Sequence, residues 1–294
     1  MTIAEEKVIL DVRPLSGTIG AEIRGVDLHQ AISDDAVAAI RAALLRYRVI
    51  FLPGQHLEPA EHLAFARRFG EVTPAHPVIP GIEGFPEIFE IDYGAPRKLA
   101  EAYGKVAKAA KGLDWHTDVT FVKRPPLGSI LNARVIPQSG GDTMFSDQVA
   151  AYEALSEPMK AFLGGLTAMH DGKEAFGQFL NAGKAVEWDG EIYTKLEPSE
   201  HPVIRTHPET GEKSIFVNKG FTSYLKGFNR SESEAILSFL YAHSVKPEFT
   251  VRYHWNAGDL GFWDNRATQH SVVGDYGMQD RVIQRVTLRG DEPR

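Results

Sequence analysis

Short strand-like segments dominate the chain after Trp115, and this pattern restricts the fold more than any other feature of the sequence. The segments are many and short, and they are separated by turns that contain Gly or Pro. The predicted strands span Leu127–Val135, Thr143–Phe145, Ile204–Thr206, Ser214–Asn218, Thr250–Trp255, Asp259–Asp264 and Arg281–Leu288. Such a run favours a sandwich or barrel with helices packed outside, a mainly β architecture with flanking helices (α+β).

Four helices are predicted, the first of them from apolar residues that recur at helical spacing. The first two span Asp34–Tyr47 and about Pro59–Phe69. Two more lie near Gln148–Leu163 and Glu232–Ala242, and the last follows a capping-box signature at Ser231–Glu234. Strands and helices do not alternate regularly, and the sequence has no GxGxxG motif and no phosphate loop. A nucleotide-binding parallel sheet is therefore not predicted.

Composition narrows the possible chemistry. The 294 residues contain no cysteine, so disulfide scaffolds, thiolate zinc sites, iron–sulfur clusters and cysteine nucleophiles are excluded. The net charge of -7 gives no overall attraction to nucleic acid or to an anionic membrane. The sequence lacks both a signal-peptide pattern at its start and an apolar run long enough for a membrane span. We therefore expect a cytoplasmic enzyme that binds neither nucleic acid nor membrane.

Three residues form a candidate metal site. His116 and Asp118 lie in the stretch Trp115-His-Thr-Asp, and on a strand their side chains would point to the same face. His270 follows a later strand-like run and would complete the set if the fold brings it close. Two histidines and one carboxylate leave positions open on an octahedral ion, which favours non-haem Fe(II) and oxygen chemistry.

The alternative reading is that this His-x-Asp pair arises by chance on the surface. Zinc can also use two histidines and a carboxylate, although the HExxH motif is absent. Other histidines lie in polar or helical contexts that suggest ordinary surface positions, namely His29, His56, His62, His201, His207 and His243. The sequence context of His76, His170 and His254 does not decide their role.

Arg281 and Arg285 form a second constellation on an otherwise apolar predicted strand. Residues 281, 283 and 285 share one face of a strand. A buried guanidinium needs an anionic partner, because an unpaired buried charge is costly. The pair could form internal salt bridges, but beside a metal site an anion-binding role is the better explanation.

Two polar stretches interrupt the pattern. Residues 93–113 are rich in Ala, Lys and Gly and have little to bury, so we expect a mobile connection that could act as an active-site lid. Residues 171–200 have the same character, and a plain surface insertion is an equal alternative for them.

The sequence resembles the taurine dioxygenase family, which also includes alkylsulfatases and aryloxyalkanoate dioxygenases. The resemblance covers nearly the whole chain. It rests on the stretches Gly20–Val26, Trp115–Phe121, Gly140–Thr143, His207–Gly211, Trp263–His270 and Arg281–Thr287. It implies a double-stranded β-helix (jelly-roll) fold in a single domain, residues 1–294.

The same resemblance implies the cofactors and their ligands. Fe(II) would bind His116, Asp118 and His270, with 2-oxoglutarate and O2 as co-substrates. Arg281, helped by the hydroxyl of Thr143, would hold the distal carboxylate of 2-oxoglutarate.

The resemblance also implies the substrate site. Arg285 would hold the anionic end of the substrate, and His76 matches a histidine that helps to bind taurine. The Phe rings around the substrate are matched by Phe121, Phe176 and Phe221. Ile79 and Gly112 stand where taurine dioxygenase has a Tyr and an Asn, and this removes polar contacts to a small amino-sulfonate.

Taurine or a related alkyl sulfonate is the leading substrate class, oxidised to an aldehyde and sulfite with formation of succinate and CO2. An alkyl sulfate ester or an aryloxyalkanoate is the alternative. A homodimer or homotetramer is expected from the family. A zinc-dependent hydrolase and a non-catalytic anion-binding jelly roll remain alternatives of a different class. The intact ligand set and both arginines argue against the binding protein.

Overall fold

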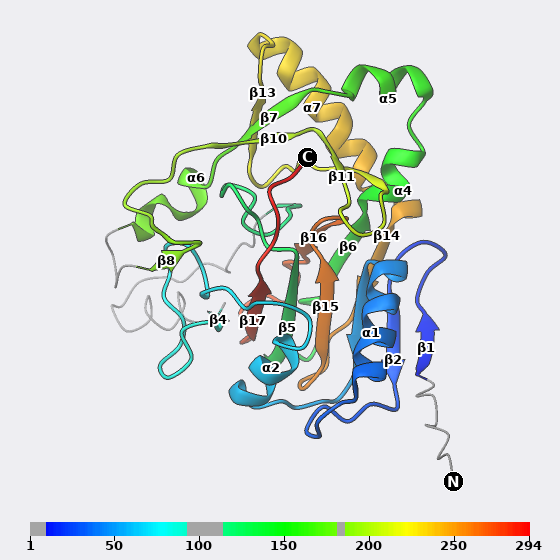
Figure 1. Ribbon diagram of the computed structural model, residues 1–294, viewed down its shortest axis with the longest axis vertical. Helices are drawn as coiled ribbons and strands as arrows, with labels where there is room; N and C mark the ends of the chain where they lie inside the picture. Colours follow the sequence, from blue (N-terminus) through cyan, green and yellow to red (C-terminus); the bar gives the residue numbers. More distant parts are fainter. Residues whose placement is uncertain (1–9, 93–113, 181–185) are drawn as a thin grey trace.

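Two facing antiparallel sheets form the centre of the molecule in the computed structural model, which describes residues 10–92, 114–180 and 186–294 (Figure 1). The major sheet has seven strands in the order β1 (Asp11–Pro14), β2 (Ala21–Arg24), β3 (Val49–Leu52), β15 (Leu260–Asp264), β5 (Gly128–Val135), β17 (Val282–Leu288) and β4 (Phe89–Asp92). The minor sheet has the order β14 (Thr250–Tyr253), β6 (Thr143–Asp147) and β16 (Thr268–Val272). Every pair in both sheets is antiparallel except β2 with β3.

Side-chain alternation along the strands explains why the major sheet is covered on both faces. In β3, Val49 and Phe51 pack into the core between the two sheets, whereas Ile50 and Leu52 pack on the opposite face. The core between the sheets is strongly aromatic, with Phe51 stacked on Tyr253 of the minor sheet at a centroid distance of 3.6 Å. Two facing sheets of this kind are the arrangement expected of a jelly roll.

Helices α1 (Asp34–Tyr47) and α2 (Pro59–Ala66) cover the outer face of the major sheet. The bounds of α1 are as predicted, and the Ser33 hydroxyl caps the helix by accepting from the amide of Ala36. Helix α2 ends three residues before the predicted Phe69. It begins with Pro59, whose missing N–H would have no helical partner at that position in any case.

A further group of elements packs around its own apolar cluster beyond the minor sheet, at the end of the molecule opposite α2 (Figure 1). It consists of α4 (Gln148–Glu153), α5 (Glu157–Leu163), α7 (Arg230–Ser244), β7 (Thr167–His170), β10 (Ser199–Pro202), β11 (Ile204–Thr206), β12 (Lys213–Ile215), β13 (Thr222–Leu225) and the 3-10 turn Pro247–Phe249. No helix in the described part of the chain is long and apolar enough to cross a membrane.

Two details of the helix predictions were wrong. The single helix expected over Gln148–Leu163 is broken into α4 and α5, because Pro158 lacks an N–H and its ring would clash with the carbonyl of residue 154 in a continuous helix. The capping box of α7 lies on Asn229 and Glu232, two residues before the predicted position.

Residues 171–180 and 186–200 contain α6 (Lys173–Phe176), the 3-10 turn Gly177–Phe179, and the short strands β8 (Glu187–Trp188) and β9 (Glu191–Ile192). Phe176 and the buried Trp188 join an apolar cluster with Phe121 and Phe221. A plain surface insertion is therefore the wrong reading for these described residues. The predicted mobile segment 93–113, which includes Gly112, lies outside the described residues.

Candidate metal centre

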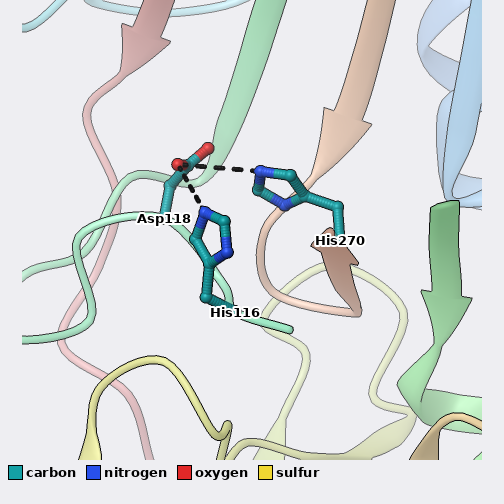
Figure 2. A group of neighbouring side chains, drawn as sticks. All are labelled: His116, Asp118 and His270. Carbon is teal, nitrogen blue, oxygen red and sulfur yellow. Dashed lines mark ion pairs between the residues drawn. The ribbon is translucent and has the colours of Figure 1, made fainter. Parts of the chain in front are cut away.

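His116, Asp118 and His270 converge at one buried point, as the sequence predicted. The Nε2 atoms of His116 and His270 lie 3.9 and 4.0 Å from the Oδ1 atom of Asp118. One ligand atom from each residue lies within 4.8 Å of the other two. Figure 2 shows the three side chains pointing toward one another. No other group of this kind occurs among the residues that the structure describes.

A short two-stranded contact, not a regular strand, holds His116 in place. Its amide donates to the carbonyl of His270 on β16, and the amide of His270 donates back, at 3.0 and 2.8 Å. Asp118 begins a turn, followed by Val119 with a φ of 54°. The prediction that His116 and Asp118 share a strand face is therefore wrong. The turn brings the carboxylate to the two imidazoles instead.

The charge state of this group suits a divalent metal ion. Burial lowers the pKa of His116 and brings the pKa of His270 to about 3, so both imidazoles are neutral. The Nδ1 of His116 donates to the carbonyl of Asp114 at 2.8 Å, which leaves the Nε2 lone pair free for a metal. Burial alone would raise the pKa of Asp118, but the charge of Arg285 outweighs burial and holds this pKa at about 2. Two neutral imidazoles and a carboxylate fit Fe(II).

Arg285 forms an internal ion pair, which is one of the two roles that the sequence allowed for it. Its Nη1 donates to Oδ1 of Asp118 in a buried ion pair, and its guanidinium carbon lies 5.2 Å from the centre of the Phe89 ring. Its Nε is buried and has no hydrogen-bond partner among the described residues. Part of the guanidinium thus serves an internal ion pair, and its Nε makes no hydrogen bond to the described residues.

Arg281 is fully buried beside Thr143, in agreement with their predicted proximity. Its Nε donates to the carbonyl of Gly141 at 3.0 Å, and its Nη2 lies 3.5 Å from the Thr143 hydroxyl. The indole Nε1 of Trp255 donates to the same hydroxyl at 2.9 Å. Sequence reasoning assigned no role to Trp255, because its partner lies on a different strand.

A cavity of about 380 Å³ opens beside the three metal-binding side chains. The predicted residues His76, Thr143, Phe176, Phe221 and Arg285 all line it. Phe121 does not belong to the lining. It packs behind the rings of Phe176 and Phe221, at centroid distances of 5.5 and 5.2 Å. Further apolar lining residues that the sequence did not single out include Phe89, Ile91, Phe179, Val272 and Ile283.

Four histidines that were expected on the surface are buried. His62, His201 and His243 each bond to a main-chain carbonyl, and His207 bonds to Asp264 at 3.0 Å. The polar and helical sequence around them gave no sign of these distant partners.

Comparison with known proteins agrees with this geometry. Residues 11–287 match the family described as "Taurine catabolism dioxygenase TauD, TfdA family". An alpha-ketoglutarate-dependent sulfate ester dioxygenase from Pseudomonas putida is 39% identical and is matched over 100% of this chain and 94% of its own length. An alkylsulfatase from Acinetobacter baylyi is 40% identical over 96% and 86% of the two chains. The crystal structure of a taurine dioxygenase from Burkholderia xenovorans has a TM-score of 0.79 and 40% identity, covering 97% of this chain and 90% of that one.

The chain therefore belongs to the TauD/TfdA family, and its jelly-roll fold is confirmed. It is an Fe(II)- and 2-oxoglutarate-dependent dioxygenase, with O2 as the second co-substrate. The zinc hydrolase and the non-catalytic binding protein are set aside, because the family and the metal-binding group agree on oxygen chemistry.

Proposed function

We propose that this dioxygenase oxidises an apolar alkyl sulfate ester, with an alkyl sulfonate as the second candidate. One observation carries the proposal: Arg285 and His76, each with a buried nitrogen that has no hydrogen-bond partner among the described residues, line a largely apolar cavity beside the metal-binding residues. A cavity with this lining suits a ligand that has one anionic end and a hydrocarbon chain.

His76 supplies a neutral donor. Its Nδ1 accepts from the amide of Val78 at 3.2 Å, so the proton of the neutral ring must be on Nε2. Burial and the nearby Arg285 charge hold the pKa of His76 well below its usual range, so the ring stays neutral near pH 7. Its Nε2 is buried and has no partner among the described residues. An anionic oxygen of the substrate would satisfy it.

Arg285 supplies the charge. The ring of His76 lies 5.5 Å from the Phe89 ring, and the Arg285 guanidinium lies 5.2 Å from the same ring, so both donors flank Phe89. A sulfate or sulfonate has three terminal oxygens and can accept from both residues at once. Charge-assisted hydrogen bonds of this kind are about twice as strong as neutral ones.

The remaining cavity wall favours a hydrocarbon over an amino-alkyl chain. Ile79, which stands at a polar position of taurine dioxygenase, lines the cavity together with Ile91, Phe176, Phe179 and Phe221. Each buried methylene of a substrate chain would contribute about 0.8 kcal/mol. An ammonium group placed there would lose hydration without gaining a partner from these side chains. Taurine is therefore a poorer fit than a longer apolar chain.

The co-substrate site is proposed at Arg281 and Thr143. The indole of Trp255 can only donate, so it occupies a lone pair of the Thr143 hydroxyl. The hydroxyl proton is thereby free to donate to a carboxylate of 2-oxoglutarate, beside the Arg281 guanidinium. Trp255 thus supports the assignment of Thr143 as a donor.

The relatives favour the sulfate ester over the sulfonate. Those named as a sulfate ester dioxygenase and an alkylsulfatase are 39% and 40% identical to this chain. A sulfonate dioxygenase from Saccharomyces cerevisiae is 30% identical, and a 2,4-dichlorophenoxyacetate dioxygenase from Cupriavidus pinatubonensis is also 30% identical. The taurine dioxygenase structure at 40% identity keeps the sulfonate as the second candidate.

In the proposed reaction, bound Fe(II) supplies the activation of O2, coupled to conversion of 2-oxoglutarate to succinate and CO2. His76 and Arg285 hold the sulfate so that the carbon bearing the ester oxygen faces the metal site. The apolar rings around the cavity exclude water from this carbon. Hydroxylation gives an unstable product whose hydroxyl proton leaves as its C–O bond to sulfate breaks. The products are an aldehyde and sulfate, and the same two donors stabilise the departing anion.

A matched substrate panel tests this proposal. We would compare kcat/KM for hexyl sulfate, hexane-1-sulfonate, hexanoate and taurine, measuring succinate formed above the substrate-free background. The proposal predicts the highest kcat/KM for hexyl sulfate and a lower value for hexane-1-sulfonate. Hexanoate and taurine should give only background succinate. Preference for taurine over both six-carbon substrates would contradict the role given to the apolar wall.

A further inference from the structure

A buried hydrogen-bond chain runs from the major sheet to the carboxylate of Asp118. The indole Nε1 of Trp263 lies 3.0 Å from Oδ1 of Asn265, and Nδ2 of Asn265 lies 2.8 Å from the hydroxyl of Ser129. That hydroxyl lies 2.6 Å from Oδ2 of Asp118. All four residues are at least 99% buried, so water does not compete for these bonds.

The chemistry of the four groups fixes the direction of every bond. An indole N–H can only donate, so the oxygen of the Asn265 amide must face Trp263. The amide nitrogen must then face Ser129 and donate to its hydroxyl oxygen. The single hydroxyl proton of Ser129 is left with one acceptor, Oδ2 of Asp118. A reversed Asn265 amide would place two donors against each other at the indole.

The two oxygens of Asp118 therefore have different tasks. Oδ2 accepts from the Ser129 hydroxyl, whereas Oδ1 accepts from Nη1 of Arg285 and is the oxygen that faces the Nε2 atoms of His116 and His270 at 3.9 and 4.0 Å. The main-chain amide of Asp118 also lies 3.4 Å from Oδ1 of Asn265. Asn265 therefore contacts the main chain of Asp118 directly and its carboxylate through Ser129. Figure 2 shows an Asp118 oxygen directed at both imidazoles.

We propose that Trp263, Asn265 and Ser129 are positioning residues that make Asp118 a metal ligand through one oxygen only. This inference rests on the metal-binding role of Asp118. A carboxylate free to bind through both oxygens would take one of the positions that 2-oxoglutarate needs. The chain thus preserves open coordination positions as well as metal affinity, because partners of metal ligands orient them and tune their strength.

The test uses Ser129→Ala, with Ser233→Ala as the matched control. Ser233 is a buried serine on α7 whose hydroxyl bonds to the amide of Leu225, outside the chain described above. Under anaerobic conditions, we would measure the Kd for Mn(II) and then the Kd for 2-oxoglutarate on the Mn(II)-loaded protein. In Ser129→Ala we expect the Mn(II) Kd to rise about 10- to 100-fold and 2-oxoglutarate binding to weaken as well. Both constants should stay within twofold of wild type in Ser233→Ala.

A double-mutant cycle separates positioning from packing. Asn265→Ala acts on Asp118 mainly through Ser129, so the fold-changes of Ser129→Ala and Asn265→Ala should not multiply in the double variant. If Ser129→Ala does not fold, Asn265→Ala with the same two titrations gives the test. Mn(II) binding within twofold of wild type in the folded variant, or fully multiplicative effects, would overturn the inference. Failure of the wild-type protein to bind Mn(II) would instead overturn the metal site itself.

Discussion

Replacing Gly220 with alanine tests the metal site by a steric change alone. A Cβ atom at Gly220 would lie 2.7 Å from the Cβ of His116, whereas carbon atoms in contact are about 3.5 Å apart. Main-chain hydrogen bonds hold both residues in place. The amide of Gly220 donates to the carbonyl of Trp115 at 3.0 Å, and His116 is tied to His270 by two main-chain hydrogen bonds. His116 and residue 220 must therefore move apart by about 0.8 Å, the difference between these two separations.

A displacement of this size exceeds the roughly 0.5 Å within which a functional site must be held. We expect the Mn(II) Kd of Gly220→Ala to rise about 10- to 100-fold, and the strain to lower the free energy of unfolding by about 1–3 kcal/mol. Anaerobic calorimetric titration measures the first quantity, and urea unfolding measures the second. Gly17→Ala is the control, since no atom lies within 4 Å of its added Cβ. Equal Mn(II) affinity in the two folded variants would refute the steric argument.

Three other predictions follow from the same contacts. Arg285→Met should lower kcat/KM for hexyl sulfate by about 30-fold or more, because loss of a buried charge partner of the substrate costs about 2–5 kcal/mol. An unchanged kcat/KM would contradict the proposed role of Arg285 in substrate binding. Trp255→Phe keeps an aromatic ring against Phe51 but loses the N–H to Thr143, so the KM for 2-oxoglutarate should rise about fivefold with little change in the substrate KM; the reverse pattern would contradict the assignment. Burial lowers the pKa of His62 from 6.5 to about 4, so its contribution to stability is present above pH 6.5 and is lost as pH falls toward 4, by at most about 3 kcal/mol. In urea unfolding, His62→Gln should flatten this pH dependence, and an identical slope in both proteins would count against it.

The sequence predicted the layered β architecture because alternation and turn residues are local signals. The bounds of α1 agree for the same reason, since Ser33 and the acidic first turn mark its start directly. The break between α4 and α5 was also visible in principle, because Pro158 forbids one continuous helix. The shifted capping box of α7 shows that a short motif can match at more than one register.

The metal-binding residues were predictable because their spacing and family motif carry the information. The partners of Asp118 were not, even though Asn265 lies inside the motif Trp263–His270. Its role depends on Ser129, which is 136 residues away in the chain and is brought beside it only by the pairing of β5 with β15. The ion pair between Arg285 and Asp118 spans 167 residues and is equally invisible to local reasoning.

The most direct test of the proposed function is the fate of hexyl sulfate in the presence and absence of O2 and 2-oxoglutarate. With Fe(II)-loaded protein, we predict that sulfate, hexanal and succinate form in equal amounts, and that removing O2 or 2-oxoglutarate stops sulfate release. Sulfate release with hexanol as the product, continuing without O2, would show hydrolysis and contradict the account.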